Sequence, residues 1–380
     1  MKIIFLTYET KEIGGSYLRS LSLAEGLVKL GHQVTLWTSA KERTLFPKIS
    51  FENGVEVIES IGVFPYRFRK GGYDPFDILL RTITILFSNC SIIHSFNHRP
   101  AATFPAFIKY IFSSQTKWFL DWADLWGKGG IADRRYGPFR FITANVDHYM
   151  EQLFIKLPFA ITPISDDLVK KAISIRKSAD HVYFLPIGAN IDFIKPLPKL
   201  ESRKKLKLST KENFLLYLYV GTYDDELLFK TFNELKKIRK DTTLILLGPK
   251  LPIFNKQKKV INKGVVSREI LPFYLAAADI MMLPFANKEI NLGKFPNKLG
   301  DYLAAGRPIV ANPTGEVKKM LMKEEIGVLV SEEPKLFAKG ISDLLNDHKK
   351  MEKLGKNARE VGLKLSWTSV AKQLEGFYIE

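Results

Sequence analysis

The first forty residues alternate between short apolar runs and one amphipathic segment. Residues 2–7 (KIIFLT) form a short apolar run with a β-branched pair, and residues 32–39 (HQVTLWTS) form a second. Between them, apolar residues recur at helical spacing from Leu18 to Val28, with Ser16 available as a cap and Gly31 as a stop. A strand, a helix and a strand in this order predict a right-handed parallel β–α–β unit.

The same alternation continues along the chain and breaks once. Further strands are expected at 55–60, 91–96, 117–123, 160–165 and 181–187. Residues 188–212 are rich in proline, lysine and turn residues, which is typical of a linker. After it, strands are expected at 214–221, 242–248, 258–264, 279–285 and 308–313, with helices such as 226–239 and 268–277. The pattern predicts two doubly wound α/β domains, 1–195 and 205–365, that face a ligand cleft.

Composition fits a globular protein of this organisation. The chain has 380 residues, of which 46% are hydrophobic, and a single cysteine, Cys90, which excludes an intrachain disulfide framework. The start lacks a signal-peptide pattern, and the most apolar run, 78–87, is interrupted by Arg81. We expect a soluble, cytoplasmic protein.

The net charge of +17 favours anionic partners. Nucleic acid is disfavoured because no nucleic-acid-binding motif is present. Residues 65–87 mix Arg67, Arg69, Lys70 and Arg81 with apolar side chains, and residues 104–112 add an aromatic-rich helix. Such a surface predicts peripheral binding at the anionic inner face of a membrane. The alternatives are core helices in this region and an ordinary lysine-rich, solvated surface.

Residues 294–308, KFPNKLGDYLAAGRP, carry the most specific chemistry. Asn297 is the expected N-cap of a helix that ends at Gly306, before Pro308. Lys298 opposes the helix dipole unless an anion binds there, and a helix N-terminus is itself a phosphate site. Asp301, three residues later, lies on the same side and could accept hydrogen bonds from sugar hydroxyls. The alternative is a simple Lys–Asp surface pair.

The stretch PNKLGDYLAAGRPIVANPTGEV resembles the nucleotide-binding segment of retaining, family 4-type glycosyltransferases of the GT-B fold. Other segments resemble this family in the expected order. They are the Gly14-Gly15 loop and residues 150–172, 184–196, 265–285 and 365–380. The resemblance therefore extends over nearly the whole chain, and it implies that a terminal helix, 366–380, returns to the first domain.

The resemblance implies a hexosyltransferase (EC 2.4) of glycan or polysaccharide biosynthesis. It would move a sugar from a nucleotide-diphosphate sugar to a hydroxyl acceptor, such as a lipid-linked glycan. Asp301 would bind the donor ribose, and Lys298 would hold the pyrophosphate and assist its departure. The other implied donor-binding residues are Gly14, Gly15, Gly221, Thr222, Gly248, Pro249, Val266, Asn297 and Leu299.

Two departures from the family pattern bear on the site. Gly293 stands where the family has a glutamate that touches the transferred sugar, so Glu289 or Asn291 are candidates to replace it. Thr222 stands where many relatives have a phosphate-binding arginine. The candidates to supply the missing charge are Lys294, Lys298 and Arg19.

In the first domain, Asp124 follows the strand at 117–123 and is the candidate to orient the acceptor hydroxyl. The alternative is a turn-capping aspartate. His94 and His98 are more often structural than catalytic in such a position, and no Cys/His cluster indicates zinc. The pairs Asp166-Asp167 and Asp224-Asp225 lack DxD spacing. We therefore expect no cofactor other than the nucleotide sugar as co-substrate, and no obligatory metal.

Three other functions remain open or disfavoured. A GT-B sugar-nucleotide 2-epimerase is the nearest alternative, and it would need carboxylates and a histidine in the cleft. A non-catalytic polyanion-binding protein is an alternative from another class. A dinucleotide-dependent dehydrogenase is disfavoured, because the loop after the first strand, TYETKEIGGSYLRS, has no GxGxxG.

Overall fold

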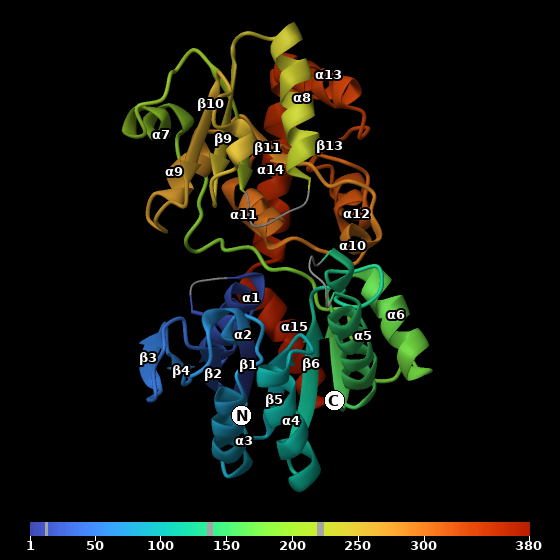
Figure 1. Cartoon of the computed structure of the whole chain (residues 1–380). Helices are drawn as coiled ribbons and strands as arrows, with labels where there is room; N and C mark the ends of the chain where they lie inside the picture. Colours follow the sequence, from blue (N-terminus) through green and yellow to red (C-terminus); the bar gives the residue numbers. More distant parts are fainter. Residues whose placement is uncertain (12–13, 135–139, 219–223) are drawn as a thin grey trace. The chain divides into compact units, whose positions relative to one another are not determined.

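A computed structural model describes residues 1–11, 14–134, 140–218 and 224–380 (Figure 1). These residues form two compact units. Unit 1 comprises Met1–Gly188, Gly293–Phe295 and Trp367–Glu380, and unit 2 comprises Ala189–Leu292 and Pro296–Ser366. Unit 1 therefore ends earlier than the boundary expected at residue 195. The segment expected to be a linker belongs to unit 2, where part of it is a helix.

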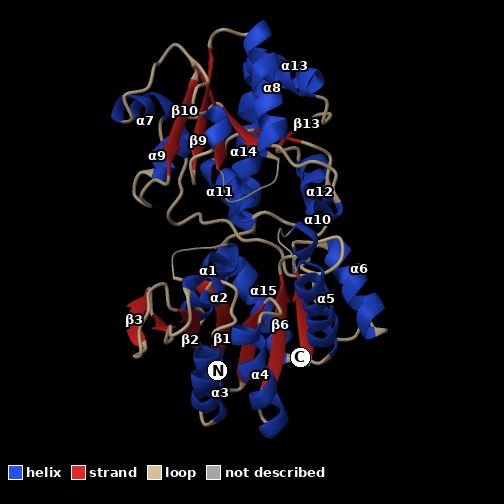
Figure 2. Cartoon of the chain, in the orientation of Figure 1, coloured by secondary structure: helices blue, strands red, loops and turns tan. Residues whose placement is uncertain are grey.

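Unit 1 is built on a seven-stranded sheet with the order β3-β4-β2-β1-β5-β6-β7 (Figure 2). The strands are β1 (Lys2–Thr10), β2 (Gln33–Ser39), β3 (Lys48–Glu52), β4 (Val55–Glu59), β5 (Ile92–Phe96), β6 (Lys117–Trp122) and β7 (Ala160–Pro163). β3 pairs with β4 in an antiparallel hairpin, and the other described pairings are parallel. The helices are α1 (Gly15–Lys29), α2 (Tyr66–Arg69), α3 (Pro75–Leu86), α4 (Pro100–Phe112), η1 (Ala132–Arg134), α5 (Arg140–Lys156), α6 (Asp166–Arg176) and α15 (Trp367–Ile379).

The last helix, α15, completes the core of unit 1. Its buried residues Ala371, Leu374 and Tyr378 share one apolar cluster with residues of β1 and α1. The Tyr378 hydroxyl lies 2.6 Å from Nδ1 of His94, which is fully buried in β5. His94 is therefore a structural residue, and the prediction that the terminal helix returns to the first domain is confirmed.

One predicted strand of unit 1 does not form a ladder. Residues 181–187 run beside β7, where Tyr183 and Leu185 donate backbone hydrogen bonds to Ile161 and Pro163. They make an isolated bridge instead of a strand. Pro163, the next residue of β7 on this side, has no N–H to donate to Tyr183, so the pairing stops after one bridge although the β-branched and aromatic pattern predicts a strand.

Unit 2 has a six-stranded, parallel sheet with the order β10-β9-β8-β11-β12-β13. Its strands are β8 (Asn213–Leu218), β9 (Thr242–Leu247), β10 (Val260–Gly264), β11 (Ile280–Leu283), β12 (Ile309–Ala311) and β13 (Gly327–Leu329). Its helices are α7 (Lys199–Lys205), α8 (Asp225–Ile238), η2 (Pro252–Phe254), α9 (Leu271–Ala277), α10 (Glu289–Leu292), α11 (Asn297–Ala305), α12 (Gly315–Glu324), α13 (Pro334–Asn346) and α14 (His348–Lys364).

In each sheet there is one point from which successive strands are added in opposite directions, and this strand reversal locates the candidate site. The reversal lies between β1 and β5 in unit 1 and between β8 and β11 in unit 2. In open α/β sheets, ligands bind beyond the carboxyl ends of the strands at such a reversal. Within the part of the chain that the structure describes, none of the helices is long and apolar enough to cross a bilayer.

Candidate functional site

Helix α11 begins one residue earlier than the sequence predicted. Asn297 is the first helical residue, and Pro296 occupies the cap position without a side-chain hydrogen bond. The prediction of Asn297 as N-cap is therefore wrong, because Pro296 already has the extended backbone of a cap (φ −71°, ψ 127°). The predicted end is confirmed, since Gly306 adopts the left-handed conformation with φ 63°.

The hydroxyl of Tyr302 fixes α11 at the strand reversal of unit 2. It accepts a hydrogen bond from the Leu218 N–H at 2.9 Å, at the carboxyl end of β8. It also donates to the carbonyl of Met282, in β11, at 3.1 Å. Because Tyr302 is fully buried, these bonds connect the helix to both strands that flank the reversal. The first turn of α11 is thereby held where the fold favours a ligand.

Lys298 lies in this first turn and combines its charge with the helix N-terminus. Its side chain is only 5% exposed, and its Nζ lies 4.5 Å from the centre of the Tyr217 ring and 3.5 Å from the Tyr217 hydroxyl. A lysine in this position adds to the positive end of the helix dipole, so that the two favour the same anion. The contact with the aromatic ring contributes to stabilising this buried cation.

Asp301 lies one turn further along the same helix. Burial raises the pKa of its carboxyl to about 7, and Arg268 opposes this shift. Because an unfolded aspartate titrates near about 3.9, the folded state holds the proton more tightly. The contribution of Asp301 to stability therefore decreases as the pH rises from about 4 through 7. Near neutral pH this carboxyl therefore changes from a protonated group that can donate a hydrogen bond to an ionised group that only accepts.

The prediction that Leu299 binds the donor is not supported by its contacts. Its side chain is fully buried, and its N–H donates to the carbonyl of Pro296 at 2.9 Å. The N–H of Leu299 is therefore engaged within the chain.

The loops expected to meet a nucleobase lie together. Gly248, directly after β9, donates its N–H to the carbonyl of Gly264 at the end of β10. Pro249 and Val266 follow in these two loops, at the carboxyl ends of neighbouring parallel strands. Gly221 and Thr222 lie outside the described residues.

Asn291 and Glu289 were the candidates to contact the transferred sugar in place of a glutamate at position 293. The amide nitrogen of Asn291 donates to Asp224 at 2.9 Å and to the carbonyl of Ala286 at 2.8 Å, so this side chain has a structural role. Glu289 is exposed at the start of α10. Gly293 is packed inside unit 1, where an added Cβ would lie 3.3 Å from Leu168. A side chain at position 293 would therefore press on that leucine, which would have to shift by a few tenths of an ångström.

A carboxylate that the sequence reasoning missed lies at the strand reversal of unit 1. Glu9, near the end of β1, accepts a hydrogen bond from the Tyr17 N–H in the first turn of α1 at 2.8 Å. Gly14 covers it with φ 98°, and an added Cβ would lie 2.2 Å from the Glu9 carboxyl carbon. Gly14 is thus required by its own backbone and by Glu9. A lone acid near the end of an apolar strand, KIIFLTYET, is the signal that could have identified it.

Asp124 lies two residues beyond β6, at the same edge of the sheet as Glu9. Burial raises its pKa, the positive charge of Lys294 lowers it, and Asp121 raises it. The charge of Asp124 in turn contributes to the pKa of Glu9, which burial raises to about 7. The structure therefore brings Glu9, Asp124 and Lys294 into one electrostatic group in unit 1, beside the loop of Gly14 and Gly15.

Arg19 does not fit the predicted role of a phosphate-binding residue. It is fully buried, and its guanidinium donates three hydrogen bonds to Asp121 at 2.9–3.1 Å. It also donates to the carbonyls of Leu185 and Pro186 at 2.9 and 2.8 Å. All of its nitrogens are engaged within unit 1, so the prediction is wrong.

The basic residues expected to attract a membrane are partly internal. Arg69 donates to the carbonyls of Phe64 and Ala40, and Arg81 pairs with Asp77 at 2.6 Å. Only Arg67 and Lys70 of the predicted four are exposed. In contrast, α3 and α4 pack side by side (Figure 1), and each helix exposes apolar side chains. The exposed residues of this α3–α4 face are Phe76, Leu79, Ile83, Phe87, Ile111 and Phe112.

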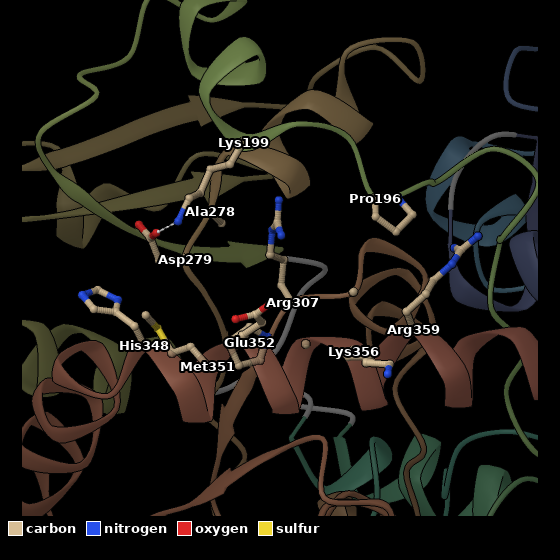
Figure 3. Close-up of a pocket in the computed structure, with 13 residues that line it drawn as sticks. Pro196, Lys199, Ala278, Asp279, Arg307, His348, Met351, Glu352, Lys356 and Arg359 are labelled. Carbon is tan, nitrogen blue, oxygen red and sulfur yellow. Dashed lines mark hydrogen bonds and ion pairs between the residues drawn. The ribbon is translucent and has the colours of Figure 1, made fainter.

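A cavity of about 550 Å³ in unit 2 lies away from the strand reversal (Figure 3). It adjoins Asp279 and Pro308, which precede β11 and β12, so it lies at the amino ends of the strands. Three of its cations have structural partners. Lys199 donates to Asp279, and Arg307 and Arg359 donate to carbonyls in the last turns of α9 and α11. These arginines cap helix C-termini, and the cavity is not a candidate catalytic site.

Comparison with known proteins finds a family that is similar to part of unit 2. Residues 216–347 match the family described as glycosyl transferases group 1. Over the whole chain, an uncharacterized glycosyltransferase of Methanocaldococcus jannaschii is 23% identical, with 98% of that protein covered. A D-inositol 3-phosphate glycosyltransferase of Corynebacterium efficiens is 31% identical over 105 residues, which are 27% of this chain and 24% of that protein.

Solved structures show the same fold. Sucrose-phosphate synthase of Thermosynechococcus elongatus superposes with a TM-score of 0.77 at 18% identity, covering 100% of this chain and 98% of that one. HepE of Anabaena, solved with UDP and glucose, gives 0.72 at 16% identity, covering 99% and 98%. The fold of the chain is GT-B, as the sequence predicted.

Proposed function

We propose that this chain, a glycosyltransferase of the GT-B fold, transfers a sugar from a nucleotide-diphosphate sugar to a hydroxyl acceptor with retention of configuration. The observation that carries the proposal is the position of Lys298. This buried cation lies at the N-terminus of a helix that Tyr302 fixes between β8 and β11. A cation and helix amides at a strand reversal suit a diphosphate. The Anabaena HepE structures, which hold UDP and UDP-glucose, support a nucleotide sugar as donor.

In this mechanism the residues of unit 2 stabilise the leaving group. Lys298 and the amides of α11 would neutralise charge that develops on the diphosphate, and Asp301 would accept hydrogen bonds from the ribose. In unit 1, Asp124 would orient the acceptor hydroxyl, which attacks from the face that the diphosphate leaves. The leaving phosphate would take the hydroxyl proton.

We also propose that the reaction requires no divalent metal. Among the described residues, no group of three or more His, Cys, Asp and Glu side chains is arranged to hold a metal ion. Lys298 and the helix N-terminus would supply the positive charge, so EDTA should leave turnover unchanged. Loss of turnover in EDTA, restored by Mg²⁺ or Mn²⁺, would refute this point.

The proposal is tested by a thermal-shift panel of nucleotide sugars in EDTA, followed by product analysis. A donor at about 100 times its dissociation constant adds about 2.7 kcal/mol of stability. The product should keep the anomeric configuration of the donor sugar. Release of an epimerised nucleotide sugar without an acceptor would instead favour the 2-epimerase. Oligonucleotide binding with steep salt dependence and no competition by nucleotide sugars would favour a polyanion-binding protein.

Asp301→Asn should weaken donor binding and remove its pH dependence. In the wild type, with a pKa of about 7, the carboxyl is ionised in about a tenth of molecules at pH 6 and in about nine tenths at pH 8. The ionised form is the better acceptor for ribose hydroxyls, so wild-type affinity should rise up to about tenfold across this range. Calorimetric titration with a nucleotide sugar, whose diphosphate does not titrate there, measures both effects. A wild-type affinity that is flat with pH would contradict the role of Asp301.

We further propose that the protein binds the cytoplasmic membrane surface through the α3–α4 face, with a lipid-linked acceptor as partner. The two most exposed apolar residues of this face, Phe87 and Phe112, are 83% and 73% exposed at the ends of their helices. Burying one such side chain contributes about 1.5–3 kcal/mol. The exposed cations Arg67 and Lys70 precede α3, at the end opposite Phe87, and are not counted in this contribution.

Phe87→Asp combined with Phe112→Asp should therefore lower binding to anionic vesicles by at least tenfold. Co-sedimentation with vesicles of mixed neutral and anionic lipid measures it. The matched control is Phe51→Asp, which changes an equally exposed phenylalanine on β3. Equal losses in the control and in the double variant would contradict docking through the α3–α4 face.

A further inference from the structure

Strand β3 is a free edge of the sheet in unit 1. Among the described residues, β4 is the only strand that pairs with it, and Figure 1 shows β3 at the outer side of unit 1. An edge strand presents backbone N–H and C=O groups with which a further strand can pair. Large apolar side chains lie exposed beside this edge. They are Leu45, Phe46, Ile49 and Phe51, which are 63–77% exposed.

The turn between β3 and β4 determines which backbone groups face outward. Both of its residues, 53–54, have positive φ (47° and 86°), as in a two-residue type I′ turn. The residues that flank such a turn, Glu52 and Val55, form a hydrogen-bonded pair, and bonded and non-bonded pairs alternate from there along the hairpin. Ile49 and Phe51 are therefore at non-bonded positions. Their N–H and C=O groups point away from β4, to the free edge.

The sequence of β3, KISFE, is complementary to itself when a second copy runs antiparallel to it. With Ser50 opposite Ser50 of the second copy, Lys48 lies opposite Glu52 and Ile49 lies opposite Phe51. Opposite charges, and an aromatic beside a β-branched residue, are stabilising cross-strand pairs. The outward backbone groups match as well, because Ile49 and Phe51 of the two copies then form hydrogen-bonded pairs, each of which exchanges two N–H···O bonds.

We propose that two copies of this chain associate through β3, paired antiparallel about Ser50, so that their sheets become continuous. The contact is isologous and therefore closes as a dimer. Pro47 restricts the register. A shift that placed Pro47 opposite Phe51 of the second copy would lose a hydrogen bond, since proline has no N–H. The association does not depend on the proposed function.

The exposed area suits a reversible dimer. Four large side chains with this exposure offer roughly 400–600 Å² of apolar surface per copy. Two copies would together bury about 800–1,200 Å², which is near the lower limit for a specific interface. We therefore expect a dissociation constant of roughly 1–100 µM.

Charge favours a second copy over an anionic lipid surface at this edge. The strand carries one cation, Lys48, and one anion, Glu52, so it does not share the positive excess of the whole chain. Glu52 already pairs with Lys11 of its own chain at 2.7 Å. The dimer would place each Glu52 between two lysines, which compensates the second cation locally.

Sedimentation equilibrium at about 0.15 M salt, where charges are screened beyond about 8 Å, measures the association. The wild type should dimerise, and Phe51→Asp should raise the dissociation constant at least tenfold. The matched control is Phe87→Asp, at an equally exposed phenylalanine at the end of α3, which should change nothing. At submicromolar concentrations, below the expected dissociation constant, the chain is monomeric, so Phe51→Asp remains a valid control for vesicle binding.

A disulfide tests the register. Facing Cα atoms in a non-bonded antiparallel pair are about 4.5 Å apart, within the range that a disulfide spans. Ser50→Cys should therefore form a covalent dimer in oxidised glutathione. Glu52→Cys is the control, because its two copies would be about four residues apart along the strand, roughly 13 Å, and should not link. The native Cys90 is buried and does not interfere.

Exchanging the charges tests the pairing itself. Lys48→Glu alone and Glu52→Lys alone each set like charges opposite one another in a dimer, and each should raise the dissociation constant at least threefold. An equimolar mixture of the two variants again has opposite charges in both pairs, and it should dimerise as tightly as the wild type. A wild type that stays monomeric well above 100 µM, an unchanged dissociation constant in Phe51→Asp, no disulfide in Ser50→Cys, or a mixture no tighter than its components would each overturn the proposal.

Discussion

Replacing Lys298 by methionine should lower kcat by about a hundredfold. The substitution keeps most of the volume of the buried side chain beside Tyr217 and removes the charge. Removing one preorganised group that stabilises a developing negative charge costs about 10²–10³ in kcat, and a hundredfold loss corresponds to about 2.7 kcal/mol of transition-state stabilisation. Because the charge on the diphosphate increases as the sugar leaves, kcat should fall more than donor affinity.

Steady-state kinetics at saturating donor and acceptor measure this effect. Lys349→Met, at an exposed lysine of α14, is the control and should keep wild-type kcat. The thermal midpoint of Lys298→Met, measured without ligand, shows whether the fold is intact. A kcat within threefold of wild type in a folded Lys298→Met protein would refute the role assigned to this residue.

Asp121→Ala should lower the free energy of unfolding of unit 1 by about 3–5 kcal/mol. The substitution leaves the guanidinium of Arg19 buried without its counter-ion, and breaking one partner of a buried pair has this cost. The three hydrogen bonds that Arg19 donates to Asp121 are lost as well. Arg19→Met should have a similar effect, because it leaves a buried carboxylate unpaired.

Urea unfolding followed by tryptophan fluorescence isolates this effect. The five tryptophans of the chain all belong to unit 1, so the signal reports that unit alone. Lys171→Ala breaks a more exposed i,i+4 pair with Asp167 on α6 of unit 1 and serves as control, with an expected change below about 1 kcal/mol. A loss for Asp121→Ala no larger than that of the control would show that the buried pair contributes little.

Regular periodicity made most of the fold predictable. The apolar runs at 2–7 and 214–221 became the central strands β1 and β8, and the helical spacing after Gly14 became α1. Two strands were missed for physical reasons. β13 has only three residues, too few for a period to appear, and β3 is an edge strand with mostly exposed side chains. For such strands, pairing with the neighbouring strand determines the extended conformation, and the local sequence pattern does not indicate it.

The candidate site could be predicted where its residues are close together in the sequence. Lys298 and Asp301 lie on one short helix, so their three-residue spacing is enough to predict that they share a side. Arg19 was misassigned because its partner, Asp121, is 102 positions away, and only the packing of α1 on the sheet brings them together. Glu9 was missed for the same reason, since its environment consists of the first turn of α1 and the charge of Asp124.

The place of α15 in the core of unit 1 has a consequence for biosynthesis. Ala371, Leu374 and Tyr378 fill positions against β1 and α1 that no earlier segment occupies. On a ribosome that adds about 5–20 residues per second, roughly 10–40 seconds separate the synthesis of Gly188 from that of α15. During that interval the apolar surface that α15 will cover stays exposed on the first half of the chain. The second half can already fold in this time. Nascent chains of this protein should therefore bind chaperones that shield apolar surface until α15 has been synthesised.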